Sequence, residues 1–151
     1  MPIIAKTSVG GYLNGQINFV SDSAQKNAQV QLNFDKLFIR INDSSLNIPE
    51  QKFVQSKVEL IWNGNMITIG DSTSFMSQEM KIKLKGNVKP TTTSKGSTYD
   101  LNLFLSLSLG GQIDKNFGFV VPQLLKCPAT AVVAGNMNVK INGPLDNFKC
   151  L

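Results

Sequence analysis

Histidine is absent from the 151-residue chain. Its absence removes the commonest general base and the usual partner of a catalytic serine or cysteine. The acidic residues are spread along the chain without a tight pair or cluster, and glycine-rich pieces such as VGGYLNG lack the lysine and the strand-to-helix setting of a phosphate loop. We therefore expect a protein that is not an enzyme and that binds no cofactor.

Cysteine is scarce, because Cys127 and Cys150 are the only two in the chain. Two cysteines are too few for a disulfide-dense scaffold, and without CxxC spacing or histidine they do not predict a zinc site. In an oxidising compartment a disulfide between them would tie the exit of the last strand to the loop before it and stabilise the fold by about 3 kcal/mol. Two free thiols are the alternative.

Long apolar runs and dense charge are also missing. No run approaches the roughly 18 residues that a membrane-spanning helix needs, and the start MPIIAKTSVGG lacks the features of a secretory signal. We expect any signal or anchor to lie upstream of Met1. With 42% hydrophobic and 17% charged residues, the composition excludes disordered and fibrous classes and predicts a single domain over residues 1–151, which the strand patterns below make β-rich.

Leucine occupies every second position of the stretch DLNLFLSLSLGG at residues 100–111. This period of two predicts a long strand with one apolar face. The loop PTTTSKGS joins it to EMKIKLKGNVK, which we expect to be its neighbour in the sheet. The residues predicted to share the apolar face are Leu101, Leu103, Leu105, Leu107 and Leu109, with Met80, Ile82 and Leu84 on the neighbouring strand.

Two roles are open for this face. In a closed barrel or a sandwich the leucines are core. In an open, curved sheet they line an apolar groove or interface that takes an acyl chain or a partner's strand. The opposite face of the neighbouring strand carries Lys81, Lys83 and Lys85, which we interpret as a solvated outer face, with a phosphate-binding stripe as the alternative.

Alternating segments fill most of the remaining chain, including QVQLNF, LFIRI and KVELIW. The triplet NGN at residues 63–65 predicts a hairpin into MITIG. AVVAGNMNVKI reads as a final strand, and Pro122 and Pro128 bound one short helical turn near 122–126. The fold class is therefore all-β, an antiparallel meander that forms a curved open sheet, a sandwich or a partly open barrel.

The basic balance, with a pI near 9.3, would suit a nucleic-acid-binding β domain. The lysine strand carries no aromatic residues for base stacking, however. We therefore expect no nucleic-acid partner and keep this function as an alternative only.

The C-terminal segment MNVKINGPLDNFK carries a pattern that occurs in a group of bacterial envelope proteins. An alternating strand runs into Gly143, the triplet LDN at 145–147 and Lys149, with Phe148 where the pattern often has proline. This segment resembles the strand-then-GxLDxPx ending of AsmA-like and TamB-like proteins and of type II secretion system protein N, also called general secretion pathway protein N. GYLNGQINF resembles the glycine-flanked strands of that group, and FGFVVPQLLK resembles the region ahead of its terminal repeat.

The resemblance implies a curved antiparallel sheet with one apolar face and no catalytic residues to carry over. It implies a Gram-negative periplasmic accessory or scaffold module of a protein-secretion machine, tethered to the inner membrane by a segment outside this sequence. Its partners would be envelope or secretion-machine proteins, and a homo-oligomer is open. A lipid-binding groove protein of the AsmA or TamB kind is the alternative.

Overall fold

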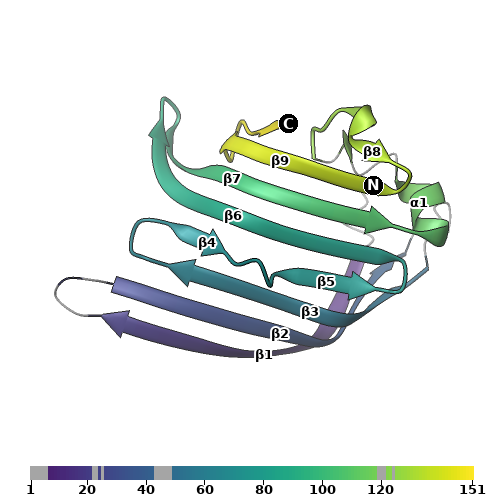
Figure 1. Cartoon of the computed structure of the whole chain (residues 1–151), viewed down its shortest axis with the longest axis horizontal. Helices are drawn as coiled ribbons and strands as arrows, with labels where there is room; N and C mark the ends of the chain where they lie inside the picture. The colour runs from purple at the N-terminus through teal and green to yellow at the C-terminus, as the bar shows by residue number, and fades with distance from the viewer. Residues whose placement is uncertain (1–6, 22–23, 25, 43–48, 119–121, 124) are drawn as a thin grey trace.

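The computed structural model describes residues 7–21, 24, 26–42, 49–118, 122–123 and 125–151. Its strands form one ten-stranded antiparallel sheet in the order β1-β2-β3-β4-β6-β7-β9-β10, as Figure 1 shows. The strands are β1 (Thr7–Ser21), β2 (Lys26–Ile41), β3 (Gln51–Trp62), β4 (Ile67–Ile69), β5 (Ser74–Ser77), β6 (Met80–Thr93), β7 (Gly96–Leu109), β8 (Val132–Val133), β9 (Asn136–Pro144) and β10 (Lys149–Cys150). The predicted all-β antiparallel fold is confirmed.

Short strands β4 and β5 both lie between β3 and β6, so these four strands form a closed circuit of pairings within the sheet. The sheet as a whole is open. Strands β1 and β10 stand at its two ends, and no pairing joins them among the described residues. The long strands β1, β2 and β3 bend at one end of the molecule (Figure 1), which gives the sheet its curvature.

Both predicted hairpins are confirmed. At NGN the amide of Asn63 donates to the carbonyl oxygen of Met66 over 3.2 Å, and Gly64 adopts a φ of 89° that suits glycine. Strands β6 and β7 pair from Met80↔Leu109 to Thr93↔Gly96. The pairing therefore reaches far into the segment PTTTSKGS, and only residues 94–95 make the turn.

The C-terminal third differs from the prediction. AVVAGNMNVKI is not one strand, because Ala134 and Gly135 turn the chain with φ values of 49° and 76° between β8 and β9.

A helix that the sequence did not predict, α1 (Gly111–Phe117), follows β7, and a 3-10 turn η2 covers Ala129–Ala131. In the predicted turn near 122–126, residues 122–123 are helical and the amide of Cys127 donates to Pro122 O over 2.7 Å. Residue 124 lies outside the described residues.

A cluster of buried apolar residues lies at the β7–β9 end of the sheet, and Phe53 of β3 is buried outside it. The members of this cluster are Leu107, Leu109, Ile113, Met137 and Val139. Ile113 on α1 is only 1% exposed, which explains why this short helix packs there. Cys127 and Cys150 form a disulfide, the first of the two predicted alternatives, and both pack against the same core.

Candidate binding surface

The eight apolar residues predicted from the leucine pattern do share one face of β6 and β7. Cross-strand partners lie on the same side of a sheet, and the register pairs Met80 with Leu109, Ile82 with Leu107 and Leu84 with Leu105. Their burial differs. Leu101, Leu107 and Leu109 are buried, whereas the other five, Leu103, Leu105, Met80, Ile82 and Leu84, are half-buried.

The same face continues across the whole sheet, which the sequence analysis did not predict. We call it the apolar face and define it by two rows of register partners. The first row is Ile17, Val30, Leu60, Ile69, Gly86, Leu103 and Ile141. The second is Phe19, Ala28, Trp62, Ile67, Val88, Leu101 and Gly143.

Exposure along the apolar face rises from one end of the sheet to the other. At the β9 end, Met137 is 1% exposed, because the helix residue Ile113 and the disulfide-bonded segment pack there. At the β1 end, Leu13, Ile17 and Phe19 are 58%, 69% and 60% exposed. The uncovered end of the apolar face is therefore an apolar surface open to solvent.

Strand β1 is the edge of the sheet at this uncovered end. In the part of the chain that the structure describes, β1 pairs with β2 alone, so residues 8–21 leave their second edge without a strand. Natural sheets protect such edges with lysine, proline or inward-pointing charges. The sequence TSVGGYLNGQINFVS has none of these, and its one irregularity is the bulge between Gly10 and Tyr12.

Sequence reasoning identified GYLNGQINF as a glycine-flanked strand but did not identify β1 as an edge, although a signal was present. Leu13, Ile17 and Phe19 alternate with polar residues, but Gly15 interrupts the apolar series. The complete lack of charge over these fifteen residues, in a chain with scattered lysines throughout, is the feature that marks an unprotected edge.

Other kinds of site find little support. Among the described residues, no three histidine, cysteine, aspartate or glutamate side chains gather as metal ligands. The described helices are all too short or too polar to span a membrane. Comparison of the chain with protein-family models, curated proteins and solved structures finds no match.

Proposed function

We propose that this chain is a non-enzymatic binding module that receives an extended strand of a partner protein along β1. The observation that carries the proposal is the combination of a fifteen-residue, uncharged edge strand with three exposed apolar side chains on one face. Strand addition to a free sheet edge provides main-chain hydrogen bonds, and alternate side chains of the added strand provide specificity.

The apolar face supplies the second part of the interaction. A strand paired with β1 would extend the rows that begin at Ile17 and Phe19, and its inward side chains would cover them together with Leu13. Full burial of each such side chain is worth about 1.5–3 kcal/mol. The backbone edge and the apolar surface therefore favour the same occupant, a polypeptide strand with alternating apolar residues.

The setting that we propose is the bacterial periplasm, as an accessory component of a protein-secretion machine. The disulfide between Cys127 and Cys150 supports an oxidising compartment. The resemblance of the C-terminal segment to type II secretion system protein N supports the secretion role. A second copy of this chain is one form that the partner can take.

A lipid ligand is the competing function, and the half-exposed apolar face favours it, because an acyl chain needs apolar contact but no backbone donors. The two functions differ in what the chain carries, a polypeptide or a lipid. A lysine at the edge hinders strand pairing, and Ile17 also lies on the apolar face that an acyl chain would cover, so Ile17→Lys should remove either occupant, and the mass of the occupant tells the two apart. Val54→Lys, at a 79% exposed residue of the internal strand β3, is the matched control.

Photo-crosslinking in the bacterial periplasm tests the proposal. A photoreactive residue at the exposed position Gln16 should give one polypeptide adduct, whose mass identifies a second copy or another protein. The same probe at Val54 should give none. The adduct should vanish in Ile17→Lys and persist in Val54→Lys. Equal adducts from both positions, or an adduct that survives Ile17→Lys, would contradict strand addition at β1.

A further inference from the structure

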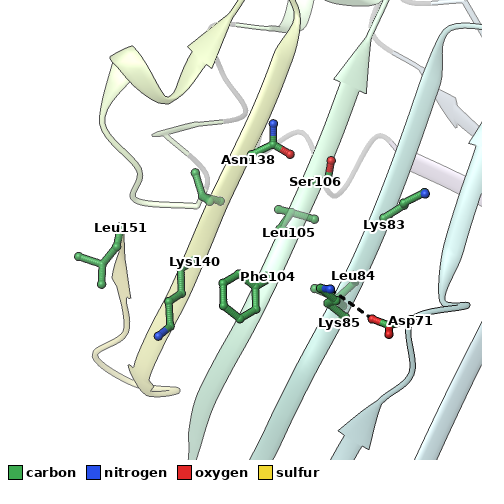
Figure 2. A pocket seen from close by; sticks show the side chains of 11 residues that line it. Asp71, Lys83, Leu84, Lys85, Phe104, Leu105, Ser106, Asn138, Lys140 and Leu151 are labelled. Atoms are coloured by element: carbon green, nitrogen blue, oxygen red, sulfur yellow. Dashed lines mark ion pairs between the residues drawn. The ribbon is translucent and has the colours of Figure 1, made fainter.

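The outer face of the sheet, opposite the apolar face, carries a hollow of about 610 Å³ over β6, β7 and β9. Figure 2 shows its lining side chains. The lining includes three lysines, one aromatic ring, one hydroxyl and one amide. They belong to Lys83, Lys85, Lys140, Phe104, Ser106 and Asn138. The hollow lies in the size range of small-ligand sites.

The sheet register arranges these side chains in two rows. Phe104 lies between Lys85 and Lys140, and Ser106 lies between Lys83 and Asn138. Neighbouring strands are about 4.8 Å apart and alternate residues of a strand about 6.6 Å apart. The lysines therefore flank this part of β7, with Lys83 and Lys85 on the β6 side and Lys140 on the β9 side.

Positive charge in the hollow is only partly neutralised. Lys85 Nζ lies 3.4 Å from Asp71 Oδ1, but both side chains are mostly exposed, so the pair is weak. Lys140 Nζ lies 5.6 Å from the centroid of the Phe104 ring, and Lys83 has no acidic partner within the described part of the chain. The side chains of Ser106 and Asn138 make no hydrogen bond there either, so both are available as donors.

We propose that this hollow binds an organic phosphate. The ammonium groups of Lys83, Lys85 and Lys140 would hold the phosphate as charge-assisted donors, with the Ser106 hydroxyl and the Asn138 amide as neutral donors. The exposed faces of Phe104 and Leu151 would pack against the apolar part of the ligand. A phosphate dianion has three terminal oxygens, which suits this number of donors better than the two oxygens of a carboxylate.

The same chemistry can come from a small phosphate ester or from the headgroup of a lipid, and two probes separate them. Isothermal titration calorimetry at low salt should measure the affinity of the chain for inorganic phosphate and for dihexanoyl phosphatidic acid below its micelle concentration. If the lipid probe binds about tenfold more tightly than inorganic phosphate, and Phe104→Ala removes this difference, the ligand is a lipid headgroup, because the ring packs on the acyl part of the lipid. Similar affinities for both probes would identify a small phosphate ester.

Paired lysine variants decide whether the hollow is the site. Lys83→Gln/Lys140→Gln should weaken both probes by at least about tenfold, because the loss of even one charge-assisted hydrogen bond is worth about that factor. The control Lys95→Gln/Lys115→Gln removes the same charge at exposed positions outside the hollow and should change affinity by no more than about twofold. The proposal is overturned if the unmodified chain binds neither probe, or if the two double variants lose affinity equally.

Discussion

The ring of Phe19 in edge strand β1 stacks on the ring of Trp62 in β3, with centroids 6.4 Å apart and planes inclined by 14°. Ala28 of β2 lies between the two in register, and its small side chain lets the rings meet across the intervening strand. Phe19 still exposes 60% of its surface. The edge of this sheet is therefore an apolar surface, in contrast to the charged edges by which most sheets avoid association.

The Phe19–Trp62 contact gives the first prediction. Trp62 is the only tryptophan, so its fluorescence reports on this site alone. Phe19→Ala should shift Trp62 emission to longer wavelength, because the indole gains contact with water, and should lower stability by about 0.5–1.5 kcal/mol. Phe104→Ala, on the opposite face, should leave the emission spectrum unchanged. An unaltered spectrum in Phe19→Ala would show that the rings do not stack in solution.

A second prediction concerns the two ends of the apolar face. Leu107 is 7% exposed in the core and Leu13 is 58% exposed on β1. Leu107→Ala should destabilise the fold by about 2–5 kcal/mol, whereas Leu13→Ala should change stability by no more than about 0.5 kcal/mol. Urea unfolding followed by circular dichroism measures both. Equal losses would mean that the β1 end is covered in the isolated chain.

The sequence predicted the leucine strand, its partner and the shared face well, because strict alternation of leucine with other residues over many positions fits a strand and not a helix. It could not predict that Leu107 and Leu109 are core while Leu103 remains half-buried. That difference depends on α1, whose short sequence GQIDKNF carries no helical pattern of apolar residues and owes its position to burial of Ile113. Tertiary packing, not local preference, sets this boundary.

Close approach of β6 and β7 at Gly86 gives a third prediction. Gly86 has a φ of 134°, and a Cβ atom there would clash with the carbonyl oxygen of Asn102. Gly96 has a similar φ of 116° but open space around it. Gly96→Ala should therefore cost only backbone strain of about 1–3 kcal/mol. Gly86→Ala should cost about 1–3 kcal/mol more, because the strands must also move apart.

The same urea measurement separates these two glycine variants. Equal unfolding midpoints for Gly86→Ala and Gly96→Ala would argue against the close β6–β7 approach.

The disulfide gives a fourth prediction. Reduction of Cys127–Cys150 opens a link between residues 23 positions apart that packs on the core, and it should lower the free energy of unfolding by about 3 kcal/mol. Cys127→Ala/Cys150→Ala should behave like the reduced chain and should not respond to reductant. An unfolding midpoint that is the same with and without reductant would mean that the bridge does not constrain the fold.

Strand β1 shows the other limit of sequence reasoning. Its alternation is visible in the letters, but whether an alternating strand is central or at an edge depends on long-range pairing. The order of the sheet reveals that residues 8–21 pair with a single strand among the described residues, and the exposed fractions reveal that Ile17 and Phe19 face solvent. The candidate site is thus a property of topology, which the residue pattern of a single strand does not contain.

Native mass spectrometry of the chain, produced in a bacterial periplasm and purified without detergent, tests strand addition at β1 most directly. We predict a polypeptide-sized added mass, either a second copy or another protein, that is lost in Ile17→Lys and retained in Val54→Lys. Bare monomer, or additions of phospholipid size with no polypeptide, would contradict the account and leave the apolar face to a lipid or to the fold alone.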